Sequence, residues 1–161
     1  MNILVPSSYA KTPEELCEEG DANSCFVQAS VLFGKSQLEG ALVFYEKACT
    51  GGHVDGCFFL GHRAESNSKE RAVALQKLRE MCDQKKYAAC THLGNISIRD
   101  NDKNKGIDSL KEACAHGEMK GCNSLGYHAK KSGDMKTAKE AFKKACDQNH
   151  PKACQSLKEM R

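Results

Sequence analysis

Apolar side chains recur along the chain at intervals of three and four residues, in short runs that each end at a cysteine. In the run from 137 to 146, the apolar positions are Ala138, Ala141, Phe142 and Ala145. This spacing places them on one face of a helix. Polar breaks precede such runs, at 34–36, 66–68, 100–102 and 132–134. No alternating run rich in valine and isoleucine occurs, so the pattern predicts helices and no sheet.

The cysteines give the period of this pattern. They form five pairs, and the two members of each pair stand eight positions apart. The first members are spaced by 32, 33, 32 and 32 residues, at Cys17, Cys49, Cys82, Cys114 and Cys146. A fixed period of this length is typical of repeat arrays. Since a polar break divides each period, we interpret one unit as an αα-hairpin of two helices of about 12 residues each.

The spacing within a pair raises a geometric question. Two cysteines eight positions apart in one continuous helix would lie about 12 Å apart, whereas a disulfide requires Cα atoms within about 7 Å. The thiols are therefore unpaired, or the chain turns back between them. In four of the pairs, turn-forming residues stand between the two cysteines, at 20–21, 51–53, 116–117 and 149–151. The segment 83–89 contains no glycine, proline or asparagine, and a turn is expected there from the repeat alone.

Composition narrows the class of protein. The chain has 161 residues, ten cysteines and no tryptophan, which suits a small core of alanine, leucine and cysteine. No run approaches 18 apolar residues, so we expect no membrane insertion. The net charge of +3 divides into −3 for residues 1–81 (8 basic, 11 acidic) and +6 for 82–161 (16 basic, 10 acidic). This asymmetry could steer an acidic partner to the C-terminal half, although a solvated lysine-rich face is the simpler interpretation.

An even number of regularly spaced cysteines is typical of a disulfide framework in an oxidising compartment. The N-terminus lacks the long apolar core of a secretory signal, but small residues at 8–10 suit a cleavage site. We therefore interpret residues 1–12 as an N-terminal segment, the remnant of a signal peptide. Residues 13–161 form a single repeat domain, and its first helix is predicted by the capping sequence Thr12-Pro13-Glu14-Glu15.

These residues resemble a known family. The recurring pattern resembles Sel1-like repeats, which are related to tetratricopeptide repeats. It consists of two cysteines separated by seven residues and followed by Leu-Gly, as at Cys122 and 125–126. Ala138, Phe142 and Ala145 match the packing positions of the second helix. The chain looks most like the Helicobacter cysteine-rich proteins, the similarity extends over residues 14–158, and the five tandem cysteine pairs make it a specific signal. The units here are shorter than is usual in the family and lack its glycine-rich insert, which leaves the pitch of the superhelix open.

The resemblance implies an all-α, right-handed αα-solenoid of about four and a half disulfide-stapled helix-turn-helix repeats. The regular cysteine pairs favour a periplasmic or secreted protein, which we expect to be a monomer. The disulfides implied are Cys17–Cys25, Cys49–Cys57, Cys82–Cys90, Cys114–Cys122 and Cys146–Cys154.

Members of the family are associated with weak penicillin binding or β-lactamase activity, which makes such activity the alternative hypothesis. Ser-x-x-Lys occurs at 8–11 and 66–69, but the Ser-Asp-Asn and Lys-Thr-Gly elements of serine β-lactamases are missing. Each cysteine pair offers only two zinc ligands, and no HExxH motif occurs. Paired cysteines leave no thiol for redox catalysis, and the lysines lack interleaved aromatic residues for nucleic acid. We expect no catalytic residue, metal, cofactor or nucleic-acid partner.

A binding surface remains as the main hypothesis. In this architecture the first helix of each unit lines a concave groove, which suits a protein or an extended peptide. An apolar stripe along it would comprise Phe26, Phe58, Ile98 and Tyr127, although each of these could equally belong to the core. Asn95 and Asn123 resemble the amides that hold peptide backbone in tetratricopeptide grooves. The complete set of groove-facing positions is Phe26, Ser30, Asp55, Phe58, His62, Glu65, Thr91, Asn95, Ile98, Lys120, Asn123, Tyr127, Lys130, Lys152 and Gln155.

Overall fold

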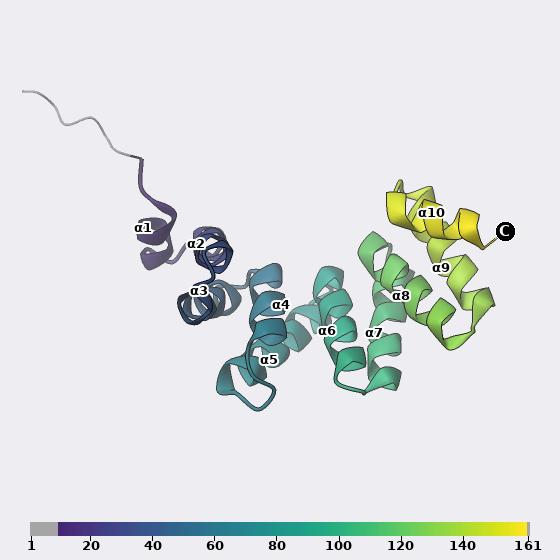
Figure 1. Ribbon diagram of the computed structural model, residues 1–161, viewed down its shortest axis with the longest axis horizontal. Coiled ribbons are helices and arrows are strands. Elements are labelled where there is room, and N and C mark those ends of the chain that lie inside the picture. Colours follow the sequence, from purple (N-terminus) through teal and green to yellow (C-terminus); the bar gives the residue numbers. More distant parts are fainter. Residues whose placement is uncertain (1–9, 161) are drawn as a thin grey trace, which may run out of the picture.

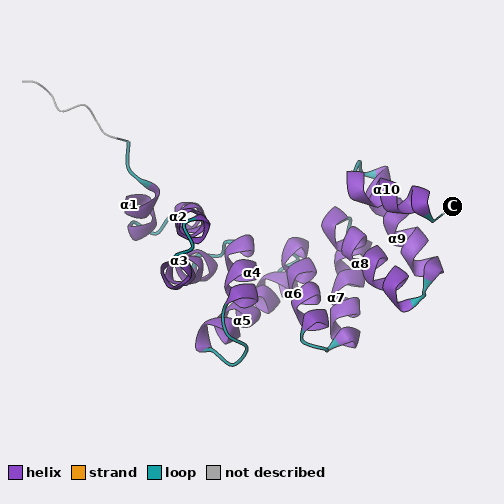
Figure 2. Cartoon of the chain, in the orientation of Figure 1, coloured by secondary structure: helices purple, strands orange, loops and turns teal. Residues whose placement is uncertain are grey.

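The computed structural model describes residues 10–160, and within them the chain forms helices joined by short turns, without a strand (Figure 2). The expected all-α repeat fold is confirmed. Most of the N-terminal segment, for which a signal-peptide remnant was predicted, lies outside the described residues. The helices are α1 (Pro13–Glu18), α2 (Ala22–Gly34), α3 (Leu38–Thr50), α4 (Val54–Arg63), α5 (Lys69–Asp83), α6 (Tyr87–Arg99), α7 (Lys103–Ala115), α8 (Met119–Ser132), α9 (Met135–Asp147) and α10 (Pro151–Glu159).

Four complete helical hairpins make up the array: α2 with α3, α4 with α5, α6 with α7, and α8 with α9. The short α1 and the single α10 complete it at the two ends. The first helices of neighbouring units also contact one another, α4 with α6, α6 with α8, and α8 with α10. The array is curved, and these helices lie toward the inside of the curve (Figure 1). The first helices therefore line its concave face.

Small residues allow the helices to approach closely. Gly94 of α6 faces Gly106 of α7, and a Cβ added to either glycine would lie within 3 Å of the other's carbonyl oxygen (2.8 and 2.7 Å). Real Cβ atoms do not occupy such positions, so α6 and α7 cross here at backbone contact. Larger side chains fill the remaining core, of which Tyr45 and Phe142 are the largest that are fully buried. This core of small residues and few rings agrees with the composition.

Each disulfide joins the second helix of one unit to the first helix of the next. The five bridges connect the cysteines eight positions apart, with Cα–Cα distances from 4.4 to 4.8 Å. All ten cysteines lie within the described residues, and none of them is free. Most are buried, whereas Cys146 and Cys154 are half-buried. The bridges therefore fasten each hairpin to its neighbour along the whole array.

The turn between Cys82 and Cys90 exists although its sequence carries no turn signal. Lys85 adopts a left-handed backbone, with φ of 65°. The equivalent residues of the other turns, also with positive φ, are Gly20, Gly52, Gly117 and Asn149. Lysine tolerates this conformation poorly. The repeat therefore overrides the local preference of this one residue.

The end of α4 departs from the other first helices. Hairpins α2–α3, α6–α7 and α8–α9 turn through a left-handed residue, at Ser36, Asn101 and Gly133 respectively. Helix α4 is ten residues long and ends at Arg63, and the next residue, Ala64, is in extended conformation. The last carbonyl groups of α4 therefore need other partners.

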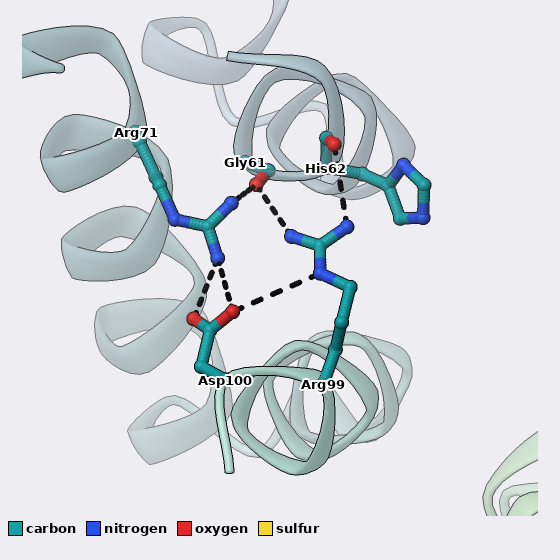
Figure 3. Close-up of polar contacts among 5 residues, drawn as sticks. All are labelled: Gly61, His62, Arg71, Arg99 and Asp100. Carbon is teal, nitrogen blue, oxygen red and sulfur yellow. Dashed lines mark hydrogen bonds and ion pairs between the residues drawn. The ribbon is translucent and has the colours of Figure 1, made fainter. Parts of the chain in front are cut away.

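Two arginines supply those partners (Figure 3). The buried Arg71 donates from Nη1 to the Gly61 carbonyl. Its Nη2 donates to both carboxylate oxygens of Asp100, at 2.7 and 2.5 Å. Arg99 donates to the carbonyls of Gly61 and His62 at 3.1 and 3.2 Å. The guanidinium groups come from α5 and α6, so this contact holds α4, α5 and α6 together.

Candidate functional site

The concave face contains a hollow of about 460 Å³ that four successive first helices share. Its lining comes from α4, α6, α8 and the start of α10. A second hollow of about 340 Å³ adjoins it and shares Asn95, Asn123, Ser124 and Lys152. We refer to the two hollows together as the concave groove. Its lining residues are Phe58, Thr91, His92, Asn95, Lys120, Asn123, Ser124, Tyr127, His128, Phe142, His150, Pro151, Lys152 and Ser156.

Seven of the positions predicted from the repeat are brought together in this groove. They are Phe58, Thr91, Asn95, Lys120, Asn123, Tyr127 and Lys152. Thr91 is only 3% exposed, and its hydroxyl donates to the Tyr87 carbonyl at 3.3 Å. The polar atoms that remain available belong mainly to two amides and two lysines. The groove therefore offers hydrogen-bond donors and acceptors together with positive charge.

The remaining predicted positions lie outside the concave groove. Asp55 binds His92, Ile98 lines a separate cleft, and Ser30 donates to the Phe26 carbonyl at 2.9 Å. Lys130 and Gln155 both contact Glu159, at 3.8 and 3.1 Å. His62 and Glu65 are exposed at the end of α4 and in the following connection, and Phe26 packs near the N-terminal end of the array.

The expected apolar stripe is interrupted. Phe26 stacks on His53 with ring centroids 4.3 Å apart, and its ring also packs against the core. Phe58 and Ile98 likewise pack against core clusters. Tyr127 differs, because it is 57% exposed at the edge of the groove. Tyr127 is thus the aromatic side chain of the stripe that is most available to a partner.

His92 is a groove residue that the repeat pattern did not indicate. Its ring stacks on Phe58 at 4.3 Å, and Nε2 lies 2.9 Å from Oδ1 of Asp55. Nδ1 is buried and has no hydrogen-bond partner within the described part of the chain. Burial lowers the pKa of His92 below its ordinary value of 6.5, against the opposing effect of the Asp55 hydrogen bond. A neutral ring that donates from Nε2 to Asp55 fits this environment.

The repeat pattern also failed to indicate other groove residues, and their places in the chain explain why they lie there. His92 and Ser124 each follow a predicted residue directly in the chain, so the groove is wider than one helical stripe. His150 is the N-cap of α10, where Nδ1 accepts from the Ala153 amide at 3.3 Å. His53 caps α4 in the same way. Both histidines directly precede a first helix in the sequence, and that position placed them at the helix N-terminus.

The residues considered for catalysis and metal binding lie elsewhere. Ser66 and Lys69 are exposed at the α4–α5 connection, and neither lines the concave groove. The neighbouring Ser68 caps α5 by accepting from the Arg71 amide at 3.2 Å. Among the described residues, Cys82, Cys90 and Glu112 have ligand atoms close together, but both sulfurs belong to a disulfide. In the same part of the chain, no helix combines the length and apolarity needed to cross a membrane.

The histidines predict a pH dependence of stability. Burial lowers the pKa of His92, and burial together with the nearby Lys131 lowers the pKa of His128. In the unfolded chain these rings take up protons near the ordinary value of 6.5, while in the folded protein they resist protonation. Folding stability is therefore highest above this pH and is expected to fall as the pH drops through it.

Urea denaturation at about pH 7.5 and about pH 5.5 checks this expectation, in a range where carboxylates stay ionised. The midpoint is expected to be lower at the acidic pH. The variant His92→Gln should show a weaker dependence, because one resisting ring has been removed. An equal or higher midpoint at the acidic pH would contradict the prediction.

Comparisons with known proteins agree with this architecture. The family model of the tetratricopeptide repeat matches residues 120–149, which cover most of α8 and α9. One similar solved structure is c5321, described as a protective antigen present in uropathogenic Escherichia coli strains and displaying an SLR fold. It superposes with a TM-score of 0.63 at 22% identity, over 92% of this chain and 35% of that chain. The present chain thus spans about a third of that protein.

A second similar structure is MamA, with a TM-score of 0.56 and 15% identity, over 88% of this chain and 86% of that one. At these identities the two likenesses show the fold. No curated protein matches the sequence.

Proposed function

We propose that this chain, a helical-repeat protein with the Sel1-like repeat fold, is a non-catalytic adaptor that binds an extended segment of another protein along its concave groove. The observation that supports this proposal is the shared lining of the groove. Side chains from α4, α6, α8 and α10 contribute to one hollow. A segment lying across them would contact four successive units at once, which a single hairpin could not offer.

The chemistry of the groove suits peptide backbone. An extended segment presents unpaired N–H and C=O groups, which need partners when water is displaced. Asn95 and Asn123 offer amides that can donate and accept. Part of this capacity is engaged, because the Asn95 amide lies 3.4 Å from the Ser124 hydroxyl. Lys120 and Lys152 add positive charge beside the amides, which favours a segment with an acidic side chain or a free carboxylate.

The disulfides also bear on where the adaptor works. Paired cysteines persist in oxidising compartments and are rare in the reducing cytosol. Five bridges in one short array therefore suit a periplasmic or secreted protein, and we include this location in the proposal. We also propose that the chain acts as a monomer, whose concave groove is open to its partner.

Tyr127→Ala is expected to weaken partner binding without loss of stability. Tyr127 is more than half exposed, so truncating it removes contact surface and leaves the core intact. The expected loss is about 1–2 kcal/mol, the range of an aromatic interface anchor. A peptide selected from a phage-displayed library of extended sequences would be titrated against both proteins by fluorescence anisotropy.

The matched control is Val43→Ala, since Val43 is comparably exposed (53%) on α3, a second helix outside the groove. It should leave the affinity unchanged. Phe58→Ala is expected to lower both affinity and stability, because its ring contacts core and groove together. Selected peptides that bind Tyr127→Ala, Lys120→Ala and Lys152→Ala as tightly as the natural chain would disprove binding in the groove.

A further inference from the structure

A larger cleft of about 1120 Å³ lies at the edge of the array, beside the concave groove. It is formed where the α6–α7 hairpin meets the second half of α8. We call it the edge cleft. Three residues, Asn95, Tyr127 and His128, line both the edge cleft and the concave groove. The other lining residues of the two sites differ. The full lining is Asn95, Ile98, Arg99, Asn101, Lys103, Asn104, Ile107, Asp108, Lys111, Tyr127, His128, Lys131 and Ser132.

The charge of this cleft is strongly positive. Four cationic side chains line it against a single acid, Asp108. Arg99 is occupied, because it donates to the carbonyls of Gly61 and His62. Lys103, Lys111 and Lys131 form no ion pair with any residue in the 10–160 region. Three lysines thus line one cleft, and within the described residues none of them has a carboxylate in ion-pair contact, although Lys111 lies near enough to Asp134 to lower its pKa.

The position of Lys103 adds to this imbalance. It is the first residue of α7, where the positive end of the helix dipole disfavours a cation. A negative group bound there would relieve that repulsion as well as pair with the ammonium. Burial, and in second place Lys131, lowers the pKa of His128, so this ring is less readily protonated than a free imidazole. The unmet charge of the cleft therefore resides on the three lysines.

Apolar side chains form part of the same surface. Ile98 and Ile107 are partly buried and pack on the C-terminal core cluster, and the exposed Tyr127 stands beside them. The amides of Asn95, Asn101 and Asn104 complete the lining. Isoleucine side chains can receive an aliphatic or aromatic side chain by burial of apolar area. Nucleic acid would instead call for a series of aromatic stacking platforms, and this cleft has one aromatic ring besides a histidine.

We propose that the edge cleft binds an acidic protein segment that carries an apolar anchor residue. Carboxylates of the segment pair with Lys103, Lys111 and Lys131, and the anchor lies against Ile98, Ile107 and Tyr127. The net charge of +6 in the C-terminal half of the chain brings such a segment to this end of the array. The proposal does not require binding in the concave groove, but Tyr127 lines both sites, so the lysines, which differ between them, are the residues that separate the two.

A defined probe tests this site: a fluorescein-labelled peptide, acetyl-Glu-Glu-Phe-Glu-Glu-Leu-amide, titrated against the full chain at low salt. Saturable binding is expected, and it should weaken as salt is added. The double variant Lys103→Glu/Lys131→Glu should lower the affinity about tenfold or more, because attraction becomes repulsion at two contacts. The matched control is Lys139→Glu/Lys144→Glu, which makes the same charge change at two exposed residues of α9 and should have little effect.

Two altered peptides separate the two parts of the cleft. Glutamine in place of each glutamate removes the charges, and serine in place of phenylalanine and leucine removes the anchors. Both should bind at least several-fold more weakly than the probe. Ile107→Ser should reduce binding of the original probe and leave the serine peptide unaffected. Circular dichroism would verify that each variant is folded.

Several outcomes would overturn the proposal. The proposal fails if the probe shows no saturable binding, or if both lysine double variants lose the same amount of affinity for it. It also fails if a short oligothymidylate binds more tightly than the peptide. If the probe binding is lost in Lys120→Glu/Lys152→Glu and kept in Lys103→Glu/Lys131→Glu, the concave groove takes acidic segments and the edge cleft does not. Failure of peptide selection on the concave groove, with probe binding at the edge cleft intact, would disprove the proposed function alone.

Discussion

Phe142→Ala is expected to lower the free energy of unfolding by about 3–5 kcal/mol, the usual cost of truncating a buried phenylalanine. The ring is 2% exposed in the C-terminal core cluster. It lies directly against the backbone of α8, since a Cβ added to Gly126 would be 2.7 Å from it. Urea denaturation followed by circular dichroism would measure the loss.

Phe142→Leu serves as the control, because it keeps most of the apolar volume and should cost clearly less. The comparison with Phe58→Ala is informative as well, since Phe58 is only partly buried and one side of its ring faces the groove. A Phe142→Ala protein as stable as the natural chain would show that the last hairpin contributes little to folding. An equal loss for Phe58→Ala would place Phe58 in the core in energetic terms.

Removal of the central disulfide, by Cys82→Ala together with Cys90→Ala, should destabilise the protein by at least about 2–3 kcal/mol. The closed loop is short, with a separation of eight residues, and this range is what loop closure alone supplies. Both cysteines are buried, at 7% and 0% exposure, so packing is lost as well. The turn that they enclose contains Lys85 in a left-handed conformation, and without the bridge it is held by helix packing and by backbone hydrogen bonds such as that from the Lys86 amide to the Met81 carbonyl.

The terminal pair gives the control, through Cys146→Ala together with Cys154→Ala. These residues are half-buried, and the α10 they attach has a neighbouring unit on one side only. In a repeat array a central unit is coupled to two neighbours and an end unit to one. The denaturation midpoint should therefore shift further for the central pair. Equal shifts would indicate that the bridges act independently of their place in the array.

The disulfides are also expected to affect partner binding. Each one holds a first helix against the second helix of the preceding unit, so the lining of the concave groove is fixed before a partner arrives. A preformed groove avoids part of the entropy cost that a mobile surface would incur on binding. The arginines at the end of α4 act in the same direction, because Arg71 and Arg99 hold α4 to α5 and α6. The central bridge variant should therefore bind selected peptides more weakly, even where it remains folded.

Local features of the sequence were enough to predict the helical hairpins and their turns, whereas the solenoid arrangement of the hairpins came from the resemblance to Sel1-like repeats. The three-and-four spacing of apolar residues places one face of each helix inward, whatever the surroundings. Caps such as Thr12 and the glycines at 20, 52 and 117 mark where helices begin and end. The distance between paired cysteines required the chain to turn back if a bridge was to form. All of these are relations between residues close in the chain. At Lys85, where the sequence has no local turn signal, the period of the repeat alone predicted the turn.

Only the tertiary structure decided which side chains of the first helices are open to a partner. Thr91 and Phe58 occupy positions that the repeat assigns to the groove, yet neighbouring units bury one and half-bury the other. His92 and the edge cleft depend on side chains from two or more helices that are distant in sequence. Arg71 lies at the apolar spacing of α5, and its polar partners become visible only once α4 and α6 are in place. Exposure and cleft formation depend on how whole units cross, which is a property of packing between helices and is absent from the pattern within any one of them.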